Sequence, residues 1–179
     1  MKVKILNIRL FHLDPVPQHL YLHYPVCKHV CSYCDFNVFS SQSIEKKGSG
    51  DFNEKWIQGL KRHFSYWLPG GKKAKLKTFY LGGGTPSLLR IEELRLLKRT
   101  LEGFFDLSLL SEFTIECNPE SVTKEYLFGL KSLGVNRVSL GVQSFQAQQL
   151  KRLERLATLS KIEKSLEYLK STFDNYSLD

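Results

Sequence analysis

One unit recurs along this sequence and limits what it can fold into: a short apolar run, a turn and an amphipathic helix. Runs with strand character, rich in β-branched and aromatic residues, lie at 19–24, 76–82, 111–117 and 136–142, and the first half of a further strand lies at 175–179. Helical periodicity covers 51–68, 90–104, 123–134, 146–156 and 160–172. The alternation predicts parallel strands joined by right-handed crossovers, an α/β fold with about four βα units and the start of a fifth strand.

Two architectures fit this alternation, an open doubly wound sheet and a (β/α) barrel. Both place functional residues at the carboxyl ends of the strands. The chemically interesting residues fall there: cysteines after the first strand, glycines after the second, Glu116 at the end of the third and Gln143 after the fourth. We therefore expect one shared site.

The segments around these units give the domain boundaries. Residues 1–18 are expected to form a lead-in and 19–179 a single domain, in which 40–50 is a polar loop, Asp51 caps a helix and 69–71 ends it. A complete barrel takes roughly 250 residues. Because the sequence ends within its fifth strand, we expect the N-terminal part of a barrel, with its remainder and any C-terminal domain absent.

Composition excludes several classes. The 179 residues are 42% hydrophobic, and the net charge of +8 is diffuse, with its densest patch at 71–77 interpreted as a solvated turn rather than a nucleic-acid site. No apolar stretch approaches the ~20 residues of a membrane span, and no signal-peptide cleavage site is visible. We expect a cytoplasmic protein, in which clustered cysteines are ligands or catalytic groups rather than disulfides.

Three of the four cysteines, Cys27, Cys31 and Cys34, lie within eight residues. Structural zinc needs four ligands, so zinc would have to recruit a histidine (23 or 29) or the distant Cys117. A [4Fe–4S] cluster is usually held by four cysteines, and three thiolates leave one iron open to a small molecule. The spacing favours the cluster but leaves both alternatives open.

Two further features bear on a ligand. The string GGGTPS (82–87) follows a strand and precedes a helix, so its backbone N–H groups could bind polar groups, or it could be a tight turn capped by Thr85 or Ser87. Glu116 is either a solvated strand end or an acceptor for ligand amino or hydroxyl groups.

The string CKHVCSYC (27–34) resembles the cluster motif of the radical SAM superfamily, whose open iron binds S-adenosylmethionine. The surrounding sequence resembles the oxygen-independent coproporphyrinogen III oxidase-like family, and within it the HemW-type haem chaperones. The similar segments occur in family order and cover most of the chain from residue 19: 21–36, 79–89, 114–121 and 134–155.

This resemblance implies a partial (β/α) TIM-like radical SAM barrel that binds a [4Fe–4S] cluster through Cys27, Cys31 and Cys34. It further implies haem as a ligand of the full-length proteins and a respiratory-chain protein as haem acceptor. It assigns S-adenosylmethionine contacts to Tyr21, Tyr33, Gly83, Gly84, Thr85, Glu116, Gln143, Arg155 and Asp179.

Phe36 separates the branches of the family. The genuine oxidases carry a further cysteine at this position, which they need, whereas the chaperone-like branch carries phenylalanine. We therefore expect a HemW-type protein, with the oxidase and an inactive truncated fragment as alternatives. The sequence also departs from the family pattern Gly-Arg-x-His, since it reads Glu-Arg-Leu-Ala over 154–157.

Overall fold

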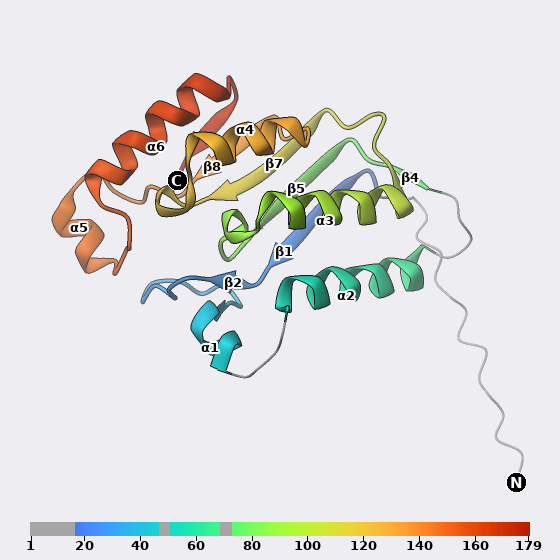
Figure 1. Cartoon of the computed structure of the whole chain (residues 1–179), viewed down its shortest axis with the longest axis horizontal. Coiled ribbons are helices and arrows are strands. Elements are labelled where there is room, and N and C mark those ends of the chain that lie inside the picture. Colours follow the sequence, from blue (N-terminus) through green and yellow to red (C-terminus); the bar gives the residue numbers. More distant parts are fainter. Residues whose placement is uncertain (1–16, 47–50, 69–72) are drawn as a thin grey trace, which may run out of the picture.

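A five-stranded parallel sheet forms the centre of the molecule (Figure 1). The computed structural model describes residues 17–46, 51–68 and 73–179. Every neighbouring pair in the sheet is parallel, and the spatial order of the strands follows the chain. In that order they are β1 (His19–Tyr24), β5 (Thr78–Gly83), β7 (Glu112–Cys117), β8 (Arg137–Leu140) and β9 (Tyr176–Leu178).

The long helices form one layer against this sheet, and each packs on the next along the chain (Figure 1). They are α2 (Phe52–Trp67), α3 (Ile91–Phe104), α4 (Lys124–Ser132) and α6 (Leu159–Thr172). A doubly wound sheet would reverse its strand order and carry helices on both faces. Sequential strand order with one helical layer is the arrangement of a (β/α) barrel, which confirms the predicted partial TIM-like barrel.

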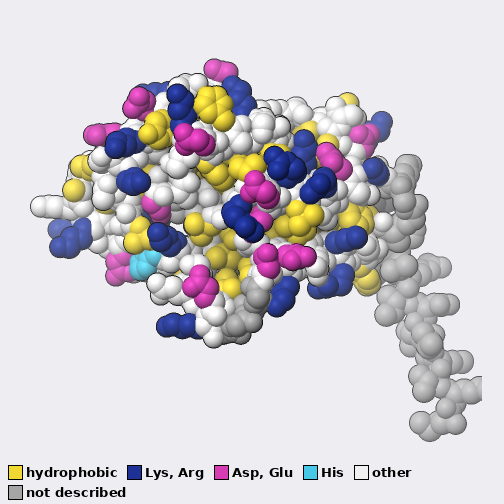
Figure 2. All heavy atoms as spheres, in the orientation of Figure 1, with side chains coloured by type: hydrophobic (Ala, Val, Ile, Leu, Met, Phe, Trp, Pro, Cys, Tyr) yellow, Lys and Arg dark blue, Asp and Glu magenta, His cyan; other side chains and the backbone are white. Residues whose placement is uncertain are grey.

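The core lies between the sheet and the helices. Alternate strand residues such as Leu22, Leu81 and Ile115 are buried there, as the two-residue period of a strand requires. The intervening residues, such as Tyr21 and Tyr80, lie on the other face of the sheet and are more exposed. On the surface in Figure 2, basic side chains are interspersed with acidic ones, consistent with the diffuse charge expected from the sequence.

Short elements complete the fold. They are α1 (Ser41–Lys46), α5 (Ala147–Arg152), the 3-10 turns η1 (Pro86–Leu88) and η2 (Pro119–Ser121), and two pairs of short parallel strands, β2 (Val26–Cys27) with β3 (Phe39–Ser40) and β4 (Ala74–Lys75) with β6 (Phe105–Asp106). Among the described helices, none is both long and apolar enough to cross a membrane.

The ends of the helices differ in part from those predicted. The Asp51 cap is confirmed, since its carboxylate accepts from the Glu54 N–H. The loop predicted at 40–50 is wrong over 41–46, where α1 forms because the Ser40 hydroxyl accepts from the Ser43 N–H at the start of the helix. The helix predicted at 146–156 is shorter than predicted, because α5 ends at Arg152. The helix end predicted at 69–71 and most of the lead-in at 1–18 lie outside the described residues.

Candidate functional site

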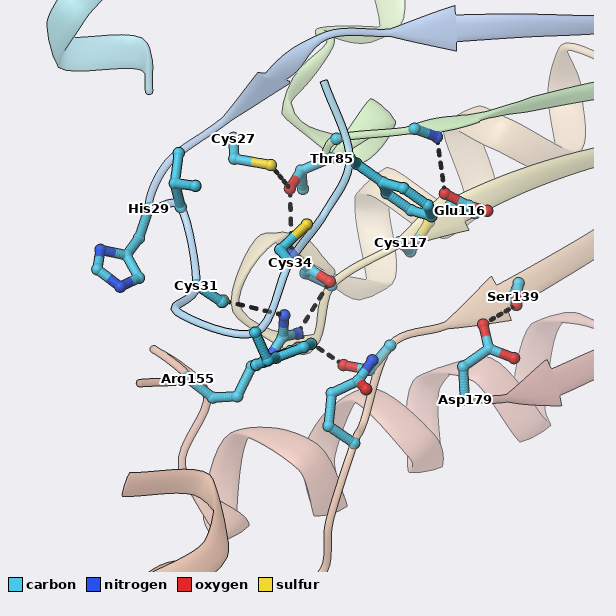
Figure 3. A pocket seen from close by; sticks show the side chains of 18 of the residues that line it. Cys27, His29, Cys31, Cys34, Thr85, Glu116, Cys117, Ser139, Arg155 and Asp179 are labelled. Atoms are coloured by element: carbon cyan, nitrogen blue, oxygen red, sulfur yellow. Dashed lines mark hydrogen bonds between the residues drawn. The ribbon is translucent and has the colours of Figure 1, made fainter. Parts of the chain in front are cut away.

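A cavity of about 450 Å³ lies at the carboxyl ends of the strands, beneath the cysteine loop (Figure 3). Its lining contains the three loop cysteines and all but one of the residues predicted to contact a ligand. The exception is Tyr21, which is 55% exposed and lies on the open face of β1, with its hydroxyl 3.2 Å from His23 Nδ1. The predicted residues that line the cavity are Cys27, Cys31, Tyr33, Cys34, Gly83, Gly84, Thr85, Glu116, Gln143, Arg155 and Asp179.

The cysteine loop runs between β2 and β3. Pairing of these two strands and a hydrogen bond from the Phe39 N–H to the Pro25 carbonyl (2.8 Å) hold its ends together. All three thiols are free, with Cys27 buried and the other two half-buried. Burial raises the pKa of the Cys27 thiol, although the Thr85 hydroxyl that donates to it works in the opposite direction.

The side chains considered as a fourth zinc ligand have other partners. His23 Nε2 lies 3.0 Å from the Asn37 carbonyl, and His29 Nε2 lies 3.7 Å from a Glu154 carboxylate oxygen. Cys117 is buried, and burial raises its pKa to about 12, which disfavours the thiolate that metals require. Within the described parts of the chain, no three His, Cys, Asp or Glu side chains are grouped to hold a single ion. The three loop cysteines are not grouped in this way either, and what they share is the cavity that they line.

The glycine run lets two strands approach closely. A Cβ on Gly84 would lie 2.6 Å from the Val26 carbonyl oxygen, and Gly83 has φ = 112°, a conformation that favours glycine. The N–H groups predicted to bind a ligand already have protein acceptors. Gly83 donates to Glu116 (2.9 Å), Gly84 to the Tyr24 carbonyl and Thr85 to the Val26 carbonyl. These glycines therefore shape the cavity wall, and their N–H groups hold protein groups in place.

Glu116 is held on both carboxylate oxygens. One oxygen accepts from the Gly83 N–H, and the other accepts from the Tyr80 hydroxyl at 2.8 Å. Burial, together with this hydrogen bond to a carboxylate, raises the pKa of Tyr80, so the hydroxyl remains a donor. Tyr80 was not among the residues predicted from the sequence. Its position two residues from Gly82 on the same strand places both on one face of the sheet, the face that also carries the Glu116 side chain.

Arg155 joins the cysteine loop to the sheet. Its Nη2 donates to Asn118 Oδ1 (3.0 Å) and to the Gly141 carbonyl (2.8 Å), and its Nη1 lies 3.9 Å from Cys31 Sγ. Its Nε is buried and has no partner. The guanidinium lines the cavity, and its planar set of donors suits a carboxylate.

Gln143 and Asp179 also line the cavity. Gln143 has φ = 65°, and its N–H donates to the Asp179 carbonyl (2.6 Å). The Asp179 N–H donates to the Leu140 carbonyl, which keeps the last residue next to β8. Its carboxylate accepts from the Ser139 hydroxyl, as Figure 3 shows. Ser139 was not predicted, because a buried strand serine carries no signal of its own.

The comparison with known proteins decides the family. Residues 21–178 match the radical SAM superfamily. The chain belongs to this superfamily. Its sequence is 36% identical over 166 residues to the heme chaperone HemW of Lactococcus lactis (91% of this chain, 40% of that protein) and 35% identical over 164 residues to HemW of Bacillus subtilis (89% and 41%). The chain thus spans about 40% of the length of these curated relatives.

The fold of this radical SAM chain is also found in a solved structure. Coproporphyrinogen III oxidase (HemN) from Escherichia coli, a radical SAM enzyme, matches it with a TM-score of 0.78 and 25% sequence identity. The match covers 91% of this chain and 36% of the enzyme. Membership of the superfamily implies a [4Fe–4S] cluster and S-adenosylmethionine as cofactors.

The departure at Glu154 has a local structural consequence. This residue follows α5 with φ = 53°, while the Arg155 N–H donates back to the Leu150 carbonyl (2.9 Å). Such a left-handed helix end is where glycine is favoured, and glycine is what the resembling family pattern has there. Glu154 therefore carries backbone strain immediately before Arg155.

We expect Glu154→Gly to raise the free energy of unfolding by about 1 kcal/mol, because glycine relieves the left-handed strain. The lost contact with His29 is between exposed side chains and is worth little. Urea unfolding of Glu154→Gly and Glu154→Ala measures the effect, since alanine removes the same contact but keeps a Cβ. Equal stability of the two variants would contradict the strain assigned to this position.

Proposed function

We propose that this chain is the cluster- and S-adenosylmethionine-binding part of a HemW-type haem-handling protein. One observation carries the proposal: three thiols, a fixed carboxylate and an arginine line a single cavity. Its volume of about 450 Å³ falls within the ~300–1,000 Å³ of small-molecule sites. Three thiolates with no fourth protein ligand suit a cluster that keeps one iron open.

In this proposal Cys27, Cys31 and Cys34 hold the cluster, whose open iron would chelate the amino and carboxylate groups of S-adenosylmethionine. Arg155, which lines the cavity, would supply the cation for that carboxylate. Tyr21 is exposed on β1, and in this proposal it contacts S-adenosylmethionine from the open face of the sheet. The remaining contacts follow the cavity wall: Tyr33, Gly83, Gly84 and Thr85 beside the cysteine loop, and Glu116, Gln143 and Asp179 along the strand ends.

Phe36 favours the chaperone over the oxidase. It lies at the cavity, is 60% exposed, and meets the His23 ring edge to face with 6.5 Å between centroids. A phenyl ring has no thiol to supply at the position where the oxidases need a cysteine. The similarity to E. coli coproporphyrinogen III oxidase keeps the oxidase as the second candidate.

The haem part of the proposal rests on the relatives, which are named heme chaperones. In a protein of that kind, haem would be passed to a respiratory-chain acceptor.

Anaerobic reconstitution followed by an activity assay tests the proposal. We expect roughly four irons per chain. We also expect no conversion of coproporphyrinogen III to protoporphyrinogen IX with dithionite and S-adenosylmethionine, measured by chromatography beside the E. coli enzyme as positive control. Sustained conversion would favour the oxidase, and absence of bound iron would reject the cluster site.

A further inference from the structure

Asn118 occupies a central position between two of the loop cysteines. It follows β7 and was not among the residues predicted to bind a ligand. Its Oδ1 accepts from Arg155 Nη2 at 3.0 Å, and its Nδ2 donates to the Thr85 hydroxyl at 3.2 Å. One amide group therefore contacts two donors that each approach a different cysteine.

Each arm of this network ends on a sulfur atom (Figure 3). Thr85 Oγ1 donates to Cys27 Sγ at 3.5 Å, and Arg155 Nη1 donates to Cys31 Sγ at 3.9 Å. Because the Thr85 hydroxyl donates its single hydrogen to sulfur, it must accept from Asn118. The amide orientation follows from this, since only Oδ1 can accept from arginine.

The surrounding backbone fixes Asn118. Its N–H donates to the Ser87 hydroxyl at 3.1 Å, and its carbonyl accepts from both the N–H and the hydroxyl of Ser121. A Cβ on Gly141 would lie 2.9 Å from Asn118 Oδ1, so the absence of a side chain there gives the amide its space. The amide thus has one well-defined arrangement.

We propose that Asn118 is a positioning residue that sets the hydrogen bonds to two of the three cluster thiolates and so raises the reduction potential of the cluster. Hydrogen bonds to cluster sulfurs stabilise the more negative, reduced state, and they are one of the factors that set such potentials. Linked hydrogen bonds also polarise one another, which strengthens each arm. The inference rests on the proposed function, because it requires a cluster on these cysteines.

Three variants separate the two arms. Asn118→Asp keeps an acceptor for Arg155 and loses the donor to Thr85. Thr85→Val removes the hydroxyl that donates to Cys27, and Asn118→Leu removes the amide's contacts with both Thr85 and Arg155 without adding charge. We expect midpoint potentials of the reconstituted clusters, measured by redox titration with EPR detection, to shift to more negative values in all three. Asn118→Leu adds no charge, so its shift reports the loss of positioning alone.

Asn136→Asp is the matched control. This amide also makes two hydrogen bonds, from the Phe113 N–H (2.8 Å) and to the Ser111 carbonyl (2.9 Å), but at the opposite end of the strands. Its potential should equal that of the unmodified chain. If Asn118→Asp and Thr85→Val retain iron with unchanged potentials, the inference is overturned while the proposed function stands. If the unmodified chain assembles no cluster, both fail.

Discussion

Cys27→Ala, Cys31→Ala and Cys34→Ala are each expected to leave the chain nearly free of iron after anaerobic reconstitution, against roughly four irons in the unmodified protein. With the three proposed ligands on one loop, removal of any one leaves two thiolates, too few to hold the cluster. Iron analysis and the cluster absorbance of the purified variants measure the loss.

Cys117→Ala is the control for this series. The Cys117 side chain is 2% exposed, and burial keeps it a neutral thiol with a pKa raised to about 12. We expect this variant to retain its iron and to lose about 1 kcal/mol of stability, the order expected for one small buried group. Loss of iron equal to that of the loop variants would show a four-cysteine site and contradict the open-iron proposal.

Gly84→Ala is expected to lower the free energy of unfolding by about 1–3 kcal/mol, the usual cost of overpacking. The new methyl group would lie 2.6 Å from the Val26 carbonyl oxygen, and backbone cannot rotate away as a flexible side chain can. Because Val26 and Cys27 form β2, the displacement should also reduce iron retention. Urea unfolding and iron analysis of the same preparation report both effects.

Gly103→Ala provides the matched substitution. Gly103 lies inside α3, and a Cβ there would meet nothing within 4 Å. Alanine should raise stability by about 0.5–1 kcal/mol, because it restricts the unfolded chain and favours the helix. If Gly84→Ala were as stable as Gly103→Ala, the close approach of the two strands would not constrain the site as described.

The sequence by itself determined the repeating pattern and the place of the site. Strand runs such as 19–24 and helical runs such as 160–172 are local periodicities, so they could be predicted to within a few residues. The cysteine loop was identifiable because its three thiols are adjacent in sequence. Parallel strands bring their carboxyl ends together, so Glu116 and Gln143 could be assigned to the same edge of the sheet before any geometry was known.

Only the tertiary structure decided how the chain uses these residues. Whether the strands form a barrel or a doubly wound sheet depends on which face of the sheet the helices cover. Each helix looks amphipathic in both folds, so its sequence pattern does not distinguish them. The contacts of Asn118 with Thr85 and Arg155 join segments 33 and 37 residues apart, which no local pattern records. The glycine N–H groups donate to Glu116 and to backbone carbonyls. This follows because β5 lies between β1 and β7, whose groups are close enough to accept from these donors.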